Sequence, residues 1–159
     1  MGVKQETSQQ LERERAIADA LEALWDVELR KLPNHYNLDF VMCINNKVKG
    51  FVEIKGSHKH AFQDLQKFGG YTINLNKIER AASLMELTGL EFRLIVDSQG
   101  EVWAARFTEF SNIGEICVFG RKDRPTQNNQ EPNFKIPLSL FKKLPITIRD
   151  KSNDATKAA

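Results

Sequence analysis

The sequence predicts one α/β domain of α+β character, in which helices flank a central β-sheet. Its 159 residues suit a single compact domain with a substantial core. Hydrophobic residues make up 41% of the chain and charged residues 28%, the usual balance of a globular protein. Segments with helical apolar spacing alternate with short runs rich in β-branched and aromatic residues, which are typical of strands. We expect the domain to span residues 1–149 and residues 150–159 to form a disordered tail.

The composition argues against membrane and disulfide-rich classes of protein. No apolar run approaches the length of a membrane span, and the first residues lack the apolar stretch of a signal peptide. Cys43 and Cys117 are the only cysteines, too few for a disulfide framework or a structural zinc site. We therefore expect a cytoplasmic protein with two reduced core thiols and no membrane partner.

The net charge of +2 is unevenly distributed along the chain. Residues 1–119 hold 14 basic and 17 acidic residues, whereas residues 120–159 hold 9 basic and 4 acidic residues. A basic C-terminal portion is compatible with a polyanionic partner, although surfaces this mildly basic are also common in proteins that bind none.

The first predicted element is a helix over about residues 8–31. Thr7 and Gln10 have the spacing of a capping box at its start. An apolar stripe then follows the helical period, formed by Leu11, Ile17, Ala18, Leu21, Leu24, Trp25 and Leu29. Glu14 falls inside this stripe rather than on the solvated face. It is therefore either a residue of the helix edge or a functional carboxylate turned toward the core.

The next two elements are predicted to form an antiparallel hairpin. Residues 38–44 and 51–55 are rich in β-branched and aromatic residues, and residues 45–47 form a polar turn between them. Side chains alternate along a strand, so Glu53 and Lys55 share one face. Charges in an apolar hairpin are costly unless they are paired or bind a metal. These charges are therefore the feature that a function must explain.

The register of this hairpin decides which of its charges meet. We expect Ile44 to face the start of the second strand, which places Asp39 close to Lys55 and Val41 close to Glu53 across the ladder. Two carboxylates and an ammonium group then gather at one end of the hairpin.

A second helix is expected from Asn76 to Thr88. Asn76 with Glu79 three residues later resembles an N-cap and its box partner, and Gly89 is a natural stop. Lys77 then lies in the first turn, where a cation opposes the helix dipole. It is either simply exposed or shares the helix start with an anion.

The remaining chain is expected to be mostly strand. Ser98 to Gly100 forms a hairpin turn between two of the strands. The elements are strands at residues 91–97, 101–107 and 113–119, a polar loop at 120–130, a strand at 134–137 that closes the sheet, and a short amphipathic helix at 138–144. Loops as long as the one at 120–130 are usually functional or disordered.

The acidic residues of the first half suit metal-assisted hydrolysis of a phosphodiester. Carboxylates fix a divalent cation, which polarises the phosphate and lowers the pKa of the attacking water. Glu14, Asp39 and Glu53, with the main-chain carbonyl of Ile54, form an oxygen-rich set that suits Mg²⁺ or Mn²⁺. Lys55 then supplies a cation near the water or the developing charge.

This order of residues resembles the PD-(D/E)XK, or restriction-endonuclease-like, nuclease superfamily. Residues 14–21 are similar to the first-helix glutamate motif of archaeal Holliday-junction resolvases, and the length and order resemble small single-domain nucleases of bacteriophages. Further similar segments lie at residues 71–77, 87–92 and 119–124, followed by Glu131-Pro132 and Ile136-Pro137. The resemblance spans roughly residues 10–144.

The chain departs from the pattern of this superfamily at three places. Leu38 stands where the motif name has proline, Glu91 stands where a proline is expected, and Phe119-Gly120 replaces an expected Gly-Gly. None of these departures removes an expected metal ligand or the lysine.

The resemblance implies a restriction-endonuclease-like core, with a central mixed β-sheet flanked by helices, and an endonuclease that cleaves DNA with Mg²⁺ or Mn²⁺. Glu14, Asp39, Glu53 and the carbonyl of Ile54 are expected to bind the metal, and Lys55 to orient or activate the water. Candidate DNA contacts are Gln66, Lys77, Arg121 and Arg124. Gln66 is alternatively an exposed helix residue, and the two arginines alternatively pair with acidic neighbours such as Asp123. Contacts to the DNA backbone carry little sequence information, so we expect weak sequence specificity.

Three other functions remain open at this stage. One is a nuclease specific for branched or nicked DNA that acts as a two-fold dimer. Another is a nuclease-like module that binds DNA or a protein without catalysis. A third, a sugar- or nucleotide-phosphate enzyme, is disfavoured because no Gly-rich phosphate loop precedes a helix. The few basic residues near the site favour a homodimer or higher homo-oligomer, located in the host cytoplasm if a phage encodes the protein.

Overall fold

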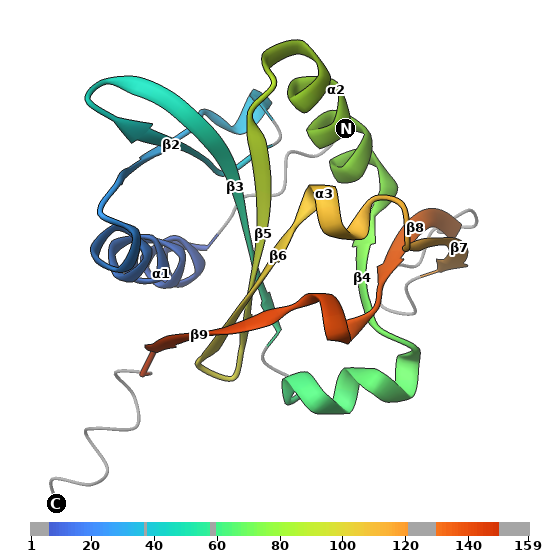
Figure 1. The fold of residues 1–159 in the computed structure, drawn as a ribbon. Helices are drawn as coiled ribbons and strands as arrows, with labels where there is room; N and C mark the ends of the chain where they lie inside the picture. The colour runs from blue at the N-terminus through green and yellow to red at the C-terminus, as the bar shows by residue number, and fades with distance from the viewer. Residues whose placement is uncertain (1–6, 37, 58–59, 121–129, 150–159) are drawn as a thin grey trace, which may run out of the picture.

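A mixed six-stranded β-sheet forms the centre of the computed structural model, which describes residues 7–36, 38–57, 60–120 and 130–149 (Figure 1). The strands lie in the order β1-β2-β3-β5-β6-β9. Their bounds are β1 Glu28–Lys31, β2 Phe40–Ile44, β3 Lys47–Ser57, β5 Glu91–Ser98, β6 Glu101–Arg106 and β9 Lys142–Thr147. β3 and β5 are parallel, whereas the other neighbouring strands are antiparallel. This mixed sheet confirms the predicted fold class.

A second, antiparallel sheet of three strands lies beside the central one. Its order is β4-β8-β7, and its strands are β4 Tyr71–Asn74, β8 Gln130–Ile136 and β7 Glu115–Gly120. A short helix, α3 Phe107–Phe110, leads from β6 toward this sheet. The segment at 134–137 was expected to close the central sheet, but it belongs to β8 of the small sheet.

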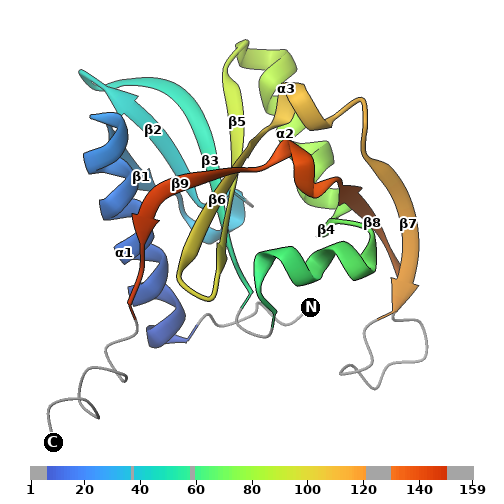
Figure 2. The ribbon, with the colours of Figure 1, turned by 60° about the horizontal axis from the view of Figure 1, so that its bottom comes forward.

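Helices cover the two faces of the central sheet (Figures 1 and 2). On one face lies α1, Ser8–Trp25, where Ile17, Ala18 and Leu21 pack in one cluster with Val52 and Ile54 of β3. On the other face lie α2 Leu75–Thr88, the 3-10 helix η2 Phe62–Phe68 and the small sheet. The core cluster there combines residues of these elements with Phe51, Phe92, Leu94 and Val96 of the sheet. No helix among the described residues is long and apolar enough to cross a membrane.

The first helix is shorter than the sequence predicts. The capping box of Thr7 and Gln10 is present, but α1 ends at Trp25, where Asp26 adopts a left-handed conformation with φ 52°. The following residues form β1 on the edge of the sheet. Leu29 continues the apolar spacing of the helix by coincidence, because a single buried leucine fits both the helical period of 3.6 residues and the strand period of two. Its backbone N–H donates to the side chain of Glu22 at 3.2 Å, which ties β1 back to α1.

The hairpin of β2 and β3 forms, but its register differs from the predicted one. Phe40 pairs with Val52 and Val41 with Phe51, so Asp39 lies level with Glu53 rather than with Lys55. The short turn causes the shift. It consists of Asn45 and Asn46 alone, both with positive φ as in tight hairpins, so Ile44 pairs with Lys47. A bulge between Met42 and Cys43 then moves the pairing by one residue, which brings Asp39 level with Glu53.

Two other predicted elements differ in the C-terminal half and in the middle of the chain. The helix expected at 138–144 is a 3-10 turn, η3 Leu138–Leu140, followed by the edge strand β9. Phe141 is buried in the core, and pairing with β6 holds the segment extended. α2 begins at Leu75 rather than at Asn76, because Asn74 caps it by accepting from the backbone N–H of Asn76 at 2.9 Å. Gly89 ends α2 as predicted.

Candidate active site

Glu53 is the centre of the candidate site. It lies in the middle of β3 and is 0% exposed. The ammonium nitrogens of Lys55 and Lys77 each lie 2.9 Å from its Oε1 atom. Its Oε2 atom is also buried and accepts no hydrogen bond from any described residue. A fully buried carboxylate oxygen without a donor is costly, so this atom is the strongest indication of a missing cation or donor.

The two lysines reach Glu53 from different elements. Lys55 is two residues further along β3 and therefore shares the face of Glu53. Lys77 comes from the first turn of α2, which packs on that face of the sheet. The sequence assigned Lys77 to a phosphate contact, whereas in the structure it is an ion-pair partner of the central carboxylate.

Asp39 is held against the backbone of β3. It lies in the bend just before β2, and it is largely buried. Its Oδ2 atom accepts a hydrogen bond of 2.8 Å from the backbone N–H of Ile54, the residue between Glu53 and Lys55. This bond fixes Asp39 beside the Glu53-Ile54-Lys55 segment, so the shifted register brings the two carboxylates to the same place.

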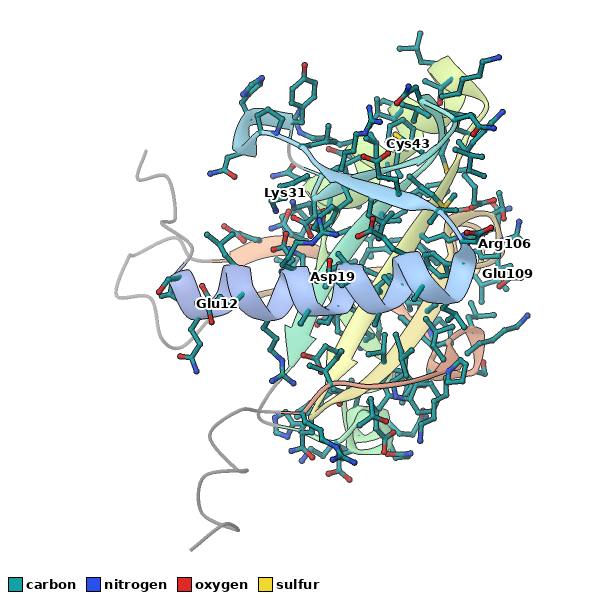
Figure 3. The ribbon with its side chains drawn as sticks, turned by 90° about the vertical axis from the view of Figure 1, so that its left-hand side faces the viewer. Glu12, Asp19, Lys31, Cys43, Arg106 and Glu109 are labelled. Carbon is teal, nitrogen blue, oxygen red and sulfur yellow. The ribbon has the colours of Figure 1, made fainter. Side chains whose placement is uncertain are left out.

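Lys31 joins Asp39 to Glu14 and was missed by the sequence analysis. Its ammonium group forms an ion pair with Oε1 of Glu14 and lies 3.5 Å from Oδ1 of Asp39. Figure 3 shows Lys31 beside α1, the helix that carries Glu14. Lys31 is the last residue of β1, a strand that the helical interpretation of residues 8–31 concealed.

Tyr71 borders the same site from β4. Burial, and secondarily the negative charge of Glu53, raise the pKa of its hydroxyl well above the usual value. The phenol is therefore neutral at physiological pH. The sequence analysis included this residue only as the start of the similar segment 71–77 and assigned it no role.

Of the remaining predicted site residues, the structure describes only Gln66. Gln66 is exposed on η2. Arg121 and Arg124 lie outside the described residues. The structure thus brings together Asp39, Glu53 and Lys55 and adds Lys77 to them, while Glu14 joins this group through Lys31.

The donor set fits a divalent cation, although the ligands are not gathered into one cluster. Carboxylate and carbonyl oxygens are the ligands that Mg²⁺ and Mn²⁺ prefer, and Oε2 of Glu53 has no donor in the described structure. Within the described ranges, no group of three or more His, Cys, Asp or Glu side chains is close enough to hold a metal ion. The carboxylates instead form two lysine-paired groups, one at Glu53 and one at Glu14 and Asp39.

The mixed sheet with helices on both faces, and this arrangement of acids and lysines, define a restriction-endonuclease-like protein of the PD-(D/E)XK class. Residues 2–144 match the model of a family described as "Phage putative PDDEXK endonuclease". The match covers most of the chain, so the protein belongs to this family. A search of curated proteins found no match. Nucleases of the PDDEXK type generally use divalent metal ions and act on DNA.

Proposed function

We propose that the protein is a metal-dependent endonuclease that hydrolyses DNA phosphodiester bonds with little sequence specificity. The observation that carries the proposal is the unpartnered Oε2 atom of Glu53, a fully buried carboxylate that faces two ammonium groups beside a second carboxylate. The family, whose description names an endonuclease of phages, supports the same conclusion.

The proposed metal ligands are Asp39, Glu53, Glu14 and the carbonyl of Ile54. Bound Mg²⁺ or Mn²⁺ supplies a Lewis acid for the phosphate and a water of lowered pKa. One ammonium group, that of Lys31, already contacts both Glu14 and Asp39. These two carboxylates are therefore placed to share a cation. This supports Glu14 as a ligand, although it is linked to the Glu53 segment only through Lys31 and Asp39.

The proposed role of Lys55 is to orient the attacking water and to neutralise the charge that develops on the phosphate. An ammonium group fixed by a buried carboxylate does not need to reorganise during the reaction, which is the basis of electrostatic catalysis. Lys77 is placed for the same electrostatic role. Gln66, Lys77, Arg121 and Arg124 are proposed to contact the DNA backbone, which positions the strand without reading its sequence.

A second copy of the chain is the proposed protein partner. β7 is an edge strand of the small sheet in the described structure, and its Ile116 and Val118 side chains are 63% and 62% exposed. In an antiparallel pair of β7 strands centred on Cys117, Ile116 of one copy lies opposite Val118 of the other, and no charges of like sign face each other. A two-fold dimer of this kind provides two active sites, which is what a junction-resolving nuclease requires.

The dimer is tested by the mass of the particle in light scattering after size exclusion. Val118→Lys is expected to halve the mass, whereas Leu87→Lys, at an exposed site of α2, leaves it unchanged. A wild-type protein that is monomeric at all concentrations contradicts the proposed dimer.

Cleavage of circular DNA tests the proposed activity. Circular single-stranded and supercoiled DNA have no ends, so any cutting of them is endonucleolytic. With Mg²⁺ or Mn²⁺ the wild type is expected to cut, and chelator is expected to abolish the reaction. Lys55→Ala is expected to lose about 10²- to 10³-fold in rate. The matched control is Lys49→Ala, an exposed lysine on the same strand, which keeps the wild-type rate.

Other outcomes distinguish the competing functions. Cleavage of four-way or nicked DNA far above that of linear duplex favours the junction-resolving function. DNA binding without cleavage by the wild type, at any metal concentration, favours a non-catalytic module and contradicts the proposal.

A further inference from the structure

A groove lies beside the candidate active site, and no role has yet been given to it. Its volume is about 560 Å³, within the range of about 300–1,000 Å³ that is common for small-ligand sites. It runs between α2 and the 3-10 turn η1, Asn34–Tyr36. The lining residues are His35, Tyr36, Asn76, Glu79, Arg80, Ser83 and Leu84.

Both walls of the groove are attached to the active site. On one side, Asn76 directly precedes Lys77, whose ammonium group contacts Glu53. On the other side, η1 belongs to the loop that connects β1, which ends at Lys31, to Asp39, the residue before β2. A backbone hydrogen bond of 2.8 Å from the N–H of Leu32 to the carbonyl of Asp39 closes the base of this loop. The groove is therefore bounded on both sides by segments that continue directly into the candidate site.

One side of the groove is aromatic, and its ring is exposed. Tyr36 is 54% exposed, and the only ring contact of its side chain in the described structure is with His35, at 4.5 Å between ring centroids. Tyr36 lies on a short turn. A hydrogen bond of 3.0 Å from the backbone N–H of Tyr36 to the carbonyl of Pro33 fixes this turn. A large ring held in solvent on a fixed turn forms a stacking platform for a second flat ring.

The polar side of the groove suits the edge of a base better than a row of phosphates. Its formal charges are balanced, because Arg80 is accompanied by Glu79. The other polar groups are the amide of Asn76 and the hydroxyl of Ser83, which both donate and accept hydrogen bonds. Leu84, which packs on the core below, supplies an apolar floor.

We infer that this groove binds an unpaired nucleobase of the DNA strand that is cut, stacked on Tyr36, and that the substrate therefore has a single-stranded segment beside the scissile phosphate. In a duplex the faces of a base are covered by its neighbours, so only an unpaired base offers a face to the ring. This inference rests on the proposed nuclease function and specifies its substrate class.

Binding of labelled oligonucleotides in the presence of EDTA tests the inference without cleavage. The probes are a single-stranded oligonucleotide and a blunt two-strand duplex of the same charge, at one fixed salt concentration. Tyr36→Ala is expected to bind the single strand about 5- to 100-fold more weakly, as stacking on one aromatic side chain predicts, and to change duplex binding less than twofold. Tyr36→Phe keeps the ring and is expected to keep the affinity.

The matched control is Leu87→Ala, which removes an 83% exposed apolar side chain from the far end of α2. It is expected to bind both probes like the wild type, and melting curves of all variants check that each is folded. A second readout uses 2-aminopurine in the single strand. Its fluorescence is expected to fall when the wild type or Tyr36→Phe binds, and to fall less with Tyr36→Ala.

The outcomes separate this inference from the proposed function. Two outcomes with a wild type that cuts DNA show that the inference is wrong while the nuclease function stands. In one, Tyr36→Ala binds both probes as tightly as the wild type. In the other, its affinity for the single strand and for the duplex falls by the same factor. If the wild type neither binds nor cuts any DNA, the proposed function fails and the inference fails with it. Stronger wild-type binding to the duplex than to the single strand also contradicts the inference.

Discussion

Two fully buried carboxylates lie on the parallel strands at the centre of the sheet, and they differ in one respect. Asp97 of β5 has donors on both oxygens: Arg13 of α1 donates to both, and the backbone N–H of Gly100 donates to Oδ1 at 3.0 Å. Glu53 of β3 has two lysines in ion-pair contact with Oε1, but neither of its buried oxygens accepts a hydrogen bond from a described residue. Buried acids are tolerated when their hydrogen bonds are complete.

The comparison supports a structural role for Asp97 and the proposed metal-binding role for Glu53. Asp97 joins α1 to the turn of the β5–β6 hairpin with a fixed, planar guanidinium, which favours stability. Glu53 is paired with two lysine ammonium groups and keeps one oxygen without an ion-pair partner or donor in the described structure, which favours a ligand. Burial alone does not distinguish the two residues, whereas the completeness of their hydrogen bonds does.

The largest expected effect is on catalysis by Glu53→Gln. Removal of the charge that pairs with both lysines, and that is proposed to hold the metal, is expected to lower the cleavage rate about 10³-fold or more, since several kcal/mol of transition-state stabilisation depend on a catalytic ion. Thermal stability is expected to change little, because the variant also removes an incompletely paired buried charge. Cleavage and melting measured on one preparation check both expectations, and a stable, fully active Glu53→Gln protein contradicts the comparison.

Asp97→Asn is expected to show the opposite pattern. Loss of the charge leaves the mostly buried Arg13 without its partner, which costs about 3 kcal/mol of unfolding free energy. Cleavage per folded molecule is expected to stay at the wild-type level, because the hydrogen bonds of the Asp97 side chain go to Arg13 and Gly100, which are not residues of the candidate site. Urea unfolding and cleavage at low temperature provide the two measurements. If the cleavage activity falls by more than the fraction of folded protein does, Asp97 is not purely structural.

Lys31→Met tests whether Glu14 and Asp39, the two carboxylates that Lys31 contacts, bind the metal as proposed. The ammonium group of Lys31 contacts Glu14 and Asp39 and competes with any other cation for them. Its removal is expected to increase the affinity for Mn²⁺ several-fold and to lower stability by about 1 kcal/mol or less, because the side chain is partly solvated. Titration with Mn²⁺ measures the affinity, and a decrease would mean that Lys31 helps to assemble the ligands.

The smallest expected effect concerns Tyr71 at high pH. Because burial raises the pKa of this phenol, the folded state holds the proton more tightly than the unfolded state. The resulting contribution to stability is complete below the ordinary tyrosine pKa of about 10 and is lost as the pH rises above it. Tyr71→Phe is expected to lose stability less steeply than the wild type between about pH 10 and 11.5. Equal slopes in urea unfolding at these pH values rule out the predicted effect.

The residues of the site were predictable where chemistry restricts the residue types. A strand with Glu53 and Lys55 on one face, an acid on the neighbouring strand and Glu14 in an apolar stripe are recognisable from spacing alone. The structure adds what spacing does not contain. Lys31 was missed because β1 follows α1 after one left-handed residue, Asp26, and Leu29 fits both periods.

Other parts of the fold depend on contacts between distant segments. The register of the β2–β3 hairpin combines a turn of only two residues, Asn45 and Asn46, with a bulge after Met42 that the turn residues do not predict. β9 was expected to be helical, but its conformation is set by pairing with the edge of β6. The groove at Tyr36 is lined by one segment that precedes β3 in the sequence and one that follows it, so no local sequence pattern predicts it.

Titration of the metal-free protein with Mn²⁺ tests the central claim most directly, because it measures the ion at Glu53 without requiring cleavage. The wild type and Asp97→Asn are expected to bind Mn²⁺ with similar affinity, and Glu53→Gln is expected to lose about tenfold or more in affinity. Equal Mn²⁺ affinity in Glu53→Gln and the wild type, or a loss confined to Asp97→Asn, would contradict the assignment of the incompletely bonded carboxylate as the metal ligand.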